Sequence, residues 1–498
     1  NKGGRTVIYD SSKSSINDWA VCINGWIFQG SKLDPYLCGA KGDGVSDDTI
    51  AMQRWLDLTE SYEFGEAVLP EGRFLYTTAL NVGGTTSIIG VGQRSILRPT
   101  ACHGLNLLQS DAVGARYIKN FWIFGNDGFN HYGINCDLIS PAQRVTGIQF
   151  DNIYVSWMLG IANLRGVWHS AFTKVYGINN YRGIRFYGKN VKVDVAACYI
   201  IRGNASNTGD GGNQYGVSFE HDESNIRSED VKVSSSIIFG YTRGVNVVAI
   251  LNGGIENCDI DYAKESGIHV ILADGGFSIK DNWIALEENS TSLIYGIYFA
   301  AFSVPKFTNR AIKDNYIMHY GSAPFGSSAG VYIGSNQNMV SVQGNSVANF
   351  SIGVYADGAN YTSIHGNSLD TKSNSVFLYY ANGTSISENY ANTPIFCYPF
   401  AVKNTKFGQN NGAMNTGSNG VGVIPAGQTS VTISFDYPIY VNNPSFLLPV
   451  AKIFGDNNIT YNFNYSGGNA TGVVFSIPSS KESITQFAYE ISVYNRVS

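Results

Sequence analysis

A constant spacing of 22 residues separates three asparagines in the second half of the chain, Asn345, Asn367 and Asn389. Each asparagine closes a polar turn before a short apolar strand, in the segments "GNSVA", "GNSLD" and "ENYAN". A glycine followed by alternating apolar residues also recurs between residues 183 and 356, as in "GIRF", "GVSF" and "GVYI". Repeats of this size predict a parallel β-solenoid, in which each coil buries its inward side chains against neighbouring coils. The alternative, a meandering antiparallel sandwich, does not predict a constant register.

The composition fits strands and turns and excludes some functions. Only 14% of the 498 residues are charged, whereas Gly (56), Tyr (31) and Phe (27) are abundant. A net charge of −5 argues against nucleic acid as the main ligand, because such binding needs a basic surface. No apolar run reaches the ~18 residues of a membrane span, so no membrane insertion is expected. The seven cysteines form no CxxC pattern and are expected to be buried thiols.

Three regions are expected along the chain. Residues 1–35 are a short lead-in, and the lack of an initiator Met indicates a processed or trimmed start. Residues 36–410 form the solenoid, which opens with a short helix that Ser46 or Asp47 caps and whose apolar positions are Ile50, Trp55, Leu56 and Leu58. The polar segment "GQNNGAMNTGSNGVG" ends the repeats, and residues 411–498 alternate as in a small antiparallel β-sandwich.

Several ordered segments resemble bacteriophage tailspikes, in particular the podophage endorhamnosidase-type tailspikes that cleave O-antigen. The opening "GAKGDGVSDDTIAMQ" and "GVGQRSILRP" are shared with many pectate-lyase-like proteins. The more specific series is "GVWHSAF", "IRGN", "IRSED", "CDIDYAKESGIHV", "GGFSIKDNWIA" and "GIYF". The resemblance covers roughly residues 36–300 and fades beyond them.

The resemblance implies a right-handed parallel β-helix of the pectate-lyase type, a homotrimer, and an endo-glycosidase that uses two carboxylates. It implies a phage tail protein that acts outside the cell at the bacterial surface and binds an O-antigen or capsular polysaccharide. Such tailspikes attach to the virion through an N-terminal head domain, which is not visible in this sequence. The family also permits a site between neighbouring subunits. No cofactor and no metal are implied.

The first catalytic carboxylate of the family falls on Glu256, in "GGIENCDIDY". Strict alternation would place Glu256 on the same face as Cys258, and a buried unpaired carboxylate is costly. We therefore expect Glu256 at a strand end or bulge, where partial burial would raise its pKa as an acid requires. A carboxylate that only caps backbone amides is the alternative.

The second family carboxylate falls on Asn289, in "WIALEENSTS", and an amide cannot serve as a proton acceptor. Glu287 lies two residues earlier and should share the outward face with Trp283, whereas Glu288 should face inward with Ile284. We expect Glu287 to be catalytic, with Glu288 as the second choice.

Substrate contacts are expected from flat aromatic rings and polar groups. The aromatic candidates are Trp283, Trp168, Tyr262 and Tyr295, and Asn289 is a polar one. Asp259 and Asp261 should face outward near Glu256 and bind sugar hydroxyls or replace the second carboxylate. His221, in the acidic segment "VSFEHDESNIRSED", could also contact substrate, although a solvated loop explains the segment equally well.

Two other functions remain open. The same solenoid hosts polysaccharide lyases, which need a uronate substrate and a base, often with Ca²⁺. A non-catalytic glycan-binding adhesin is the third class, which the amide at position 289 keeps open. A deacetylase is weaker, because no Ser/His/Asp arrangement is evident.

Overall fold

The structure is a computed structural model of the chain. It describes residues 6–498 except 111–115, 126–129, 141, 204–213, 274, 288–293, 301–309, 322–327, 336, 394, 398–405, 409, 413–416, 425–427, 440–446, 455–458, 467–468, 479–484 and 496–498. The chain divides into two compact units, residues 1–259 and residues 260–498.

The first unit opens with short antiparallel strands and the helix. β1 (Val7–Tyr9) and β2 (Cys22–Ile23) pair with β3 (Trp26–Phe28), and 3-10 turns lie at Ser11–Lys13, between β1 and β2, and at Pro35–Cys38, after β3. Helix α1 spans Thr49–Ser61, after β4 (Asp43–Asp47). The expected cap is only partly correct: the Asp47 carboxylate accepts the Thr49 N–H at 2.9 Å, but the N-terminal boundary residue is Asp48.

Asp48 turns its carboxylate away from the helix and accepts the N–H groups of Lys41 and Gly42 at 2.7 and 3.0 Å. Trp55 and Leu56 are buried as expected, but Ile50 is 74% exposed. Residues 50 and 55 are separated by five steps of 100°, which puts them on different sides of the helix. The assignment of Ile50 to the apolar face was therefore wrong.

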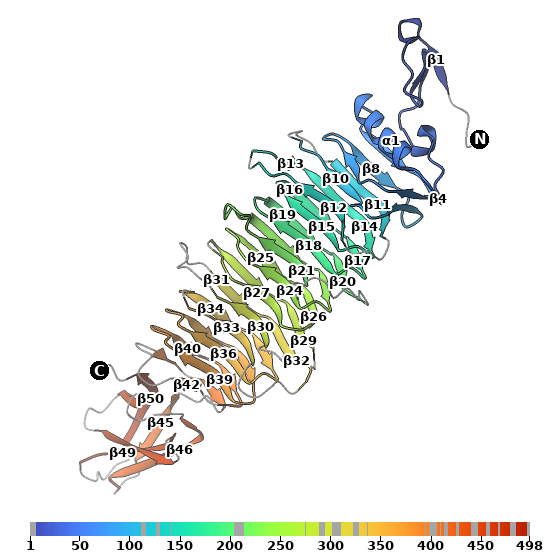
Figure 1. Cartoon of the computed structure of the whole chain (residues 1–498). Helices are drawn as coiled ribbons and strands as arrows, with labels where there is room; N and C mark the ends of the chain where they lie inside the picture. Colours follow the sequence, from blue (N-terminus) through green and yellow to red (C-terminus); the bar gives the residue numbers. More distant parts are fainter. Residues whose placement is uncertain are drawn as a thin grey trace. The chain divides into compact units, whose positions relative to one another are not determined.

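Parallel strands in stacked coils make up the rest of the first unit (Figure 1). One sheet contains, in order, β7 (Leu80–Val82), β10 (Leu105–Leu107), β12 (Tyr132–Asp137), β15 (Gly160–Arg165), β18 (Arg182–Tyr187), β21 (Tyr215–Glu220) and β24 (Arg243–Val247). The facing strands begin with β5 (Glu66–Leu69), β6 (Gly72–Tyr76), β8 (Ser87–Gly90) and β9 (Ser95–Pro99). They continue through β11 (Arg116–Phe124), β13 (Val145–Thr146), β14 (Ile148–Ser156), β16 (Val167–Thr173), β19 (Val191–Ala196), β22 (Glu229–Ser234) and β25 (Gly253–Glu256). A third row contains β17 (Tyr176–Ile178), β20 (Tyr199–Ile201) and β23 (Ile237–Phe239).

The second unit repeats this arrangement. One sheet contains β27 (Ser266–Val270), β30 (Ile294–Phe299), β33 (Ser328–Ile333), β36 (Ile352–Asp357), β39 (Asn374–Tyr379) and β42 (Ile395–Cys397). The next row contains β28 (Phe277–Lys280), β31 (Arg310–Lys313), β34 (Val340–Gln343), β37 (Ser363–His365), β40 (Ser385–Ser387) and β43 (Lys406–Phe407). The third contains β29 (Trp283–Leu286), β32 (Tyr316–His319), β35 (Ser346–Ala348), β38 (Ser368–Asp370), β41 (Tyr390–Ala391) and β44 (Asn411–Gly412). β26 (Asp259–Ala263) spans the division between the units.

The recurring asparagines form a buried ladder in the second unit. The Asn345 side-chain amide and backbone N–H both donate to the Asn367 side-chain oxygen, each at 2.9 Å. The same pair of bonds joins Asn367 to Asn389, and the ladder runs in order through Asn282, Asn315, Asn345, Asn367, Asn389 and Asn410. Each asparagine therefore fixes the start of one strand against the next coil.

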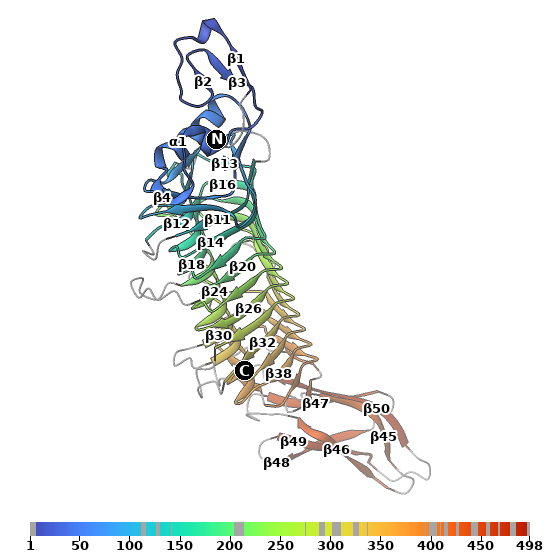
Figure 2. The ribbon, with the colours of Figure 1, turned by 90° about the vertical axis from the view of Figure 1, so that its right-hand side faces the viewer.

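Antiparallel strands follow the last coil (Figure 2). β50 (Thr485–Asn495) pairs with β45 (Gly417–Ile424) and β47 (Leu447–Phe454), while β49 (Asn469–Ser476) pairs with β46 (Ser430–Ile439) and β48 (Thr460–Ser466). The two sheets contact each other through β45 and β46. The predicted all-β class, a parallel β-helix with one helix and a C-terminal antiparallel β-region, is confirmed. The domain boundaries at 35/36 and 410/411 stay predictions.

Two sequence expectations concern buried and membrane-crossing segments. The cysteines whose side chains the structure describes are free, and all but the half-buried Cys102 are buried: Cys22, Cys38, Cys102, Cys136, Cys198 and Cys258. Burial raises the pKa of the Cys198 and Cys258 thiols to about 12. Within the described ranges, no helix is long and apolar enough to cross a membrane.

Replacing Asn367 with leucine, which has a similar volume, is expected to destabilise the second unit. The Asn345 side-chain amide would lose its acceptor, and the carbonyls of Val342 and His365 would lose a donor. Each unsatisfied buried group costs about 1–3 kcal/mol. Urea unfolding followed by circular dichroism should show a clearly lower midpoint, whereas Ser368→Ala, at the adjacent exposed position, should change it little. An unchanged midpoint for Asn367→Leu would contradict a stabilising role for the ladder.

Candidate functional site

Glu256 is the last residue of β25, in register with Ser234 of β22. Ile255 is buried, the Glu256 side chain is 19% exposed, and Cys258 is buried again. Between them, Asn257 has a φ of 53°, so the chain bends there and the alternation gains one residue. The expectation of a strand end therefore agrees with the structure. The premise that alternation puts Glu256 on the face of Cys258 was wrong, because the left-handed residue separates the two.

An ammonium group lies directly against this carboxylate. The Lys232 Nζ forms an ion pair with Glu256 Oε1, and Lys232 stands in register with Gly254 of the same strand as Glu256. On the other side, Lys232 is in register with the exposed Asp194 of β19. A neighbouring cation favours the ionised carboxylate. The arrangement therefore suits a base or a nucleophile better than the acid that partial burial alone would favour.

Asp259 and Asp261 follow Glu256 beyond the bend. Asp259 is exposed and its N–H donates to the Ser236 carbonyl at 2.9 Å. Asp261 is half-buried, and its carboxylate accepts the Tyr262 N–H at 2.9 Å. The outward orientation expected for Asp259 agrees with its exposure. In Asp261, by contrast, one carboxylate oxygen is already occupied by the hydrogen bond from the neighbouring backbone N–H.

Glu287 directly follows β29 in the second unit. Its N–H donates to the Ala263 carbonyl at 2.9 Å, and its carboxylate lies 3.7 Å from the Lys264 ammonium. At the start of the same strand Trp283 is 40% exposed, and Ile284 is buried as expected. Glu288 and Asn289 lie outside the described residues, so the choice between Glu287 and Glu288 stays a prediction.

Exposed aromatic rings gather around this strand. The Trp283 ring stacks on that of Tyr316 in the next coil, with centroids 4.6 Å apart and planes 11° apart. Past the other end of the strand, the exposed rings of Tyr262 and Tyr320 lie 5.0 Å apart. Four residues of extended strand separate Trp283 from Glu287, about 13 Å. Such a strip of rings offers apolar faces to a chain of sugars.

Tyr316 and Tyr320 were missed from sequence. The signal for Tyr316 was present: it occupies in "DNYIM" the position that Trp283 occupies in "DNWIA", one coil earlier. Tyr295, an expected substrate contact, lies in the other sheet of the coil and packs on Tyr298 and Tyr332.

Trp168 and His221 lie apart from Glu256. Trp168 is near the start of β16, with the Arg144 and Lys189 cations 5.0 and 4.9 Å from its ring centroid. β19 and β22 separate its strand from β25 in the ladder. His221 follows β21 in the opposite sheet, where its Nδ1 lies 3.0 Å from the Asp222 carbonyl. The structure therefore does not bring these two residues to the Glu256 strand end, and their proposed contacts remain untested.

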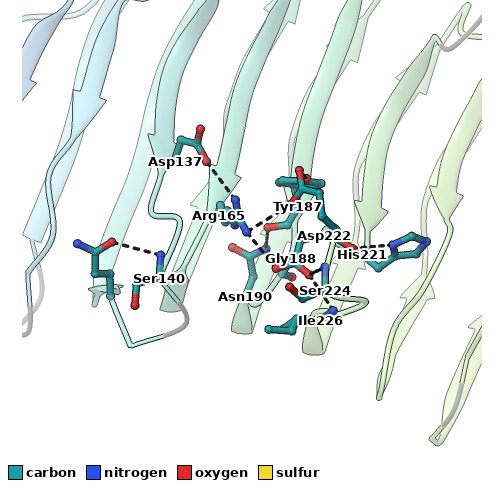
Figure 3. A network of polar contacts seen from close by, with 12 residues as sticks. Asp137, Ser140, Arg165, Tyr187, Gly188, Asn190, His221, Asp222, Ser224 and Ile226 are labelled. Atoms are coloured by element: carbon teal, nitrogen blue, oxygen red, sulfur yellow. Dashed lines mark hydrogen bonds and ion pairs between the residues drawn. The ribbon is translucent and has the colours of Figure 1, made fainter.

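The acidic segment around His221 forms an internally satisfied network (Figure 3). Asp222 is buried and accepts the N–H groups of Ser224 and Ile226 at 3.0 and 2.9 Å. Its other oxygen binds the Arg165 guanidinium at 3.1 Å, and Arg165 also lies 3.8 Å from Asp137. Asp222 thus caps the loop and is not a free carboxylate.

Glu220, at the end of β21, is held in the same way by Arg185. Two Arg185 nitrogens donate to one Glu220 oxygen at 3.1 and 2.7 Å, and the Ser218 hydroxyl donates to the other at 2.8 Å. Burial raises the pKa of Glu220, but the hydrogen bonds and charge of Arg185 outweigh it and leave the pKa below its ordinary value. Glu220 therefore stays ionised at neutral pH and is excluded as an acid. Among the described residues, no three His, Cys, Asp or Glu side chains gather into a metal site.

Replacing Glu220 with glutamine should destabilise the first unit at neutral pH, because Arg185 would lose its charged partner, at a cost of about 1.5–3 kcal/mol. The folded-state pKa of Glu220 lies below its ordinary 4.5, so the stabilisation is present at neutral pH and is lost as the pH falls through that folded-state pKa. Urea midpoints at pH 7 should therefore differ between wild type and Glu220→Gln, and the difference should shrink in acid. Glu71→Gln, which breaks an exposed pair with Arg94, should cost about 1 kcal/mol or less.

Comparison with known proteins agrees with this fold. No family model matches the sequence. A tail spike protein of Shigella phage Sf6 is 29% identical over 279 residues, which cover 52% of this chain and 44% of that protein. Two structures of mutant tailspikes of E. coli bacteriophage HK620, in complex with a hexasaccharide and with a pentasaccharide, have TM-scores of 0.53 and 0.54 at 11% identity over 94% of each chain. The resemblance to phage tailspikes that the motifs predict is therefore confirmed.

Proposed function

We propose that this chain is the glycan-recognising part of a phage tailspike and that it hydrolyses internal glycosidic bonds of a bacterial O-antigen or capsule. The observation that carries the proposal is the Glu256 carboxylate, partly buried at a strand end of a β-helix and paired with Lys232. The similarity to a tail spike protein over 279 residues supports it.

The two carboxyl groups take different roles in this proposal. Hydrolysis needs an ionised group that attacks the sugar or activates water, and an acid that protonates the departing oxygen. Glu256, in direct contact with an ammonium, is the ionised partner. Glu287, with Glu288 as the alternative, is the proton donor; for this role it must take up a proton and leave Lys264, which lies 3.7 Å away, before the bond is cleaved. Asp259 and Asp261 contribute hydrogen bonds to sugar hydroxyls.

The polymer is bound along the aromatic strip. Trp283 and Tyr316 present their exposed edges and faces at one end, and Tyr262 and Tyr320 do so at the other. Sugar rings pack their C–H faces on such side chains and need no charge for it. In this proposal the protein is a homotrimer on the phage tail that acts at the bacterial surface.

A lyase on the same fold is disfavoured by an ion-paired lysine. β-Elimination needs an unprotonated base, and Lys232, the lysine beside Glu256, is held in an ion pair with that carboxylate. The products separate the two reactions, since hydrolysis adds water to each new end and elimination leaves an unsaturated end.

Glu256→Gln is expected to lower the rate of polymer shortening by about 10²–10⁴-fold, because the amide can neither attack nor accept a proton. Purified O-antigen or capsule would be digested, with product masses and chain length followed over time. Asp194→Asn, which removes an exposed carboxylate in register with Lys232, should leave the rate near wild type. Equal rates for Glu256→Gln and wild type would remove Glu256 from the mechanism, and glycan binding without any shortening by the wild type would favour an adhesin.

Trp283→Ala is expected to weaken binding of an oligosaccharide product by about tenfold, on the order of 1.4 kcal/mol. The measurement is calorimetric titration in a Glu256→Gln background, so that the ligand is not consumed. Tyr390→Ala is the matched control, because Tyr390 occupies the equivalent position of a later coil, is exposed, and is in register with a serine. A comparable loss in both variants would argue against a specific role for Trp283.

A further inference from the structure

A cavity of about 210 Å³ lies on the outer face of the first coils, apart from the carboxylates described above. Its walls are Arg73 of β6, Ile96 and Arg98 of β9, and Trp122 and Phe124 of β11. Arg73 is in register with Ile96, and Ile96 with Trp122, so these side chains form one row across three strands. Five strand-to-strand steps lead from β11 to β25 in the ladder, about 24 Å at the usual strand spacing.

The two arginines converge on Gly44. A Cβ built on Gly44 would lie 3.4 Å from the Arg73 Cδ and 3.6 Å from one terminal nitrogen of Arg98. That nitrogen of Arg98 donates to the Gly44 carbonyl at 3.3 Å. Among the residues the structure describes, neither guanidinium has a carboxylate partner. Two unneutralised like charges repel each other, and an anion placed between them would relieve the repulsion.

The rest of the cavity wall is aromatic and held in place. The Trp122 indole N–H donates to the Ser156 hydroxyl at 2.8 Å, which fixes the plane of the ring. The Trp122 and Phe124 rings meet edge to face with centroids 5.1 Å apart, and the Arg98 guanidinium lies over Phe124 at 5.8 Å. A small inorganic anion has no apolar surface to pack against this wall, whereas a pyranose ring can pack its C–H face on it.

We propose that this cavity binds one carboxylate-bearing sugar residue, a hexuronate, with its carboxylate between Arg73 and Arg98 and its ring against Trp122. Planar guanidinium groups match carboxylates through paired hydrogen bonds. The cavity is smaller than the ~300 Å³ of ordinary ligand sites, which suits a single sugar ring. That the sugar belongs to the polymer cleaved elsewhere on the chain rests on the proposed function. Acidic polymer would then be held at a point distant from the cleaved bond.

The test is binding of free D-glucuronate to the full chain by ligand-observed NMR titration, with methyl glucoside and inorganic phosphate as comparison probes. We expect glucuronate to bind, methyl glucoside to bind at least tenfold more weakly, and both Arg98→Gln and Arg73→Gln to lose about 10–100-fold in glucuronate affinity. Arg94→Gln is the matched control, since Arg94 lies near the same strands but is paired with Glu71 outside the cavity. Arg73→Gln keeps the test valid if Arg98→Gln misfolds, because the Arg73 side chain makes no polar contact with described groups.

The proposal would be overturned by no glucuronate binding, by Arg98→Gln and Arg73→Gln variants that bind glucuronate as tightly as wild type, or by phosphate binding as tightly as glucuronate at the same site. A change in sedimenting mass for the arginine variants would also overturn it and assign the arginines to a contact between copies of the chain. Binding of a monosaccharide needs no cleavage. Polymer shortening without glucuronate binding therefore refutes this site alone, and glucuronate binding without shortening refutes the proposed hydrolysis alone.

Discussion

Hydrogen bonds between buried asparagine side chains on successive coils determine how the second unit is built. Each side-chain oxygen accepts two N–H groups from the coil before it, as Asn367 does from Asn345. Buried amides must be paired, so a slip of one residue would leave donors and acceptors unsatisfied along the whole ladder. The residue that follows each asparagine is therefore held directly beside the residue that follows the asparagine of the next coil. That is why Trp283 and Tyr316 stack, and why a row of exposed rings exists at all.

In the first unit, cysteine and serine occupy the turn position that asparagine occupies in the second unit. The equivalent positions are Cys198, Ser236 and Cys258, where the Cys198 N–H donates to the Ser236 hydroxyl at 3.1 Å. Aromatic rings also stack between successive coils in the core of this unit, as Phe150 does on Phe172 with ring centroids 4.3 Å apart. The left-handed residue Asn257 before Cys258 turns Glu256 outward, and left-handed residues also precede the ladder asparagines, as Asp281 does before Asn282.

The repeat in the sequence was sufficient to predict the parallel coils, since a 22-residue period with one buried amide per turn has few other solutions. Face assignments near the bends were less predictable. Strict alternation failed at Glu256 because Asn257 adopts a left-handed conformation, and nothing in a period-two pattern marks that extra residue. Ion pairs between coils, such as Lys232 with Glu256 and Arg185 with Glu220, join residues 24 and 35 positions apart. Such pairs depend on which residues of successive coils lie side by side. The lengths of the inserted loops vary from coil to coil, so this register could not be predicted from the sequence.

Charge placement follows from the same geometry. Unpaired charge is costly inside a solenoid, so most charged residues lie on its outer face, about one strand spacing from those on adjacent coils. Three carboxylates contact a cation from another coil and are thereby neutralised: Glu220 by Arg185, Asp222 by Arg165 and Glu256 by Lys232. Arg73 and Arg98 break this pattern, since they lie on adjacent strands around Gly44 with aromatic rings beside them. Two neighbouring cations that no described carboxylate neutralises point to an anionic partner from outside the chain.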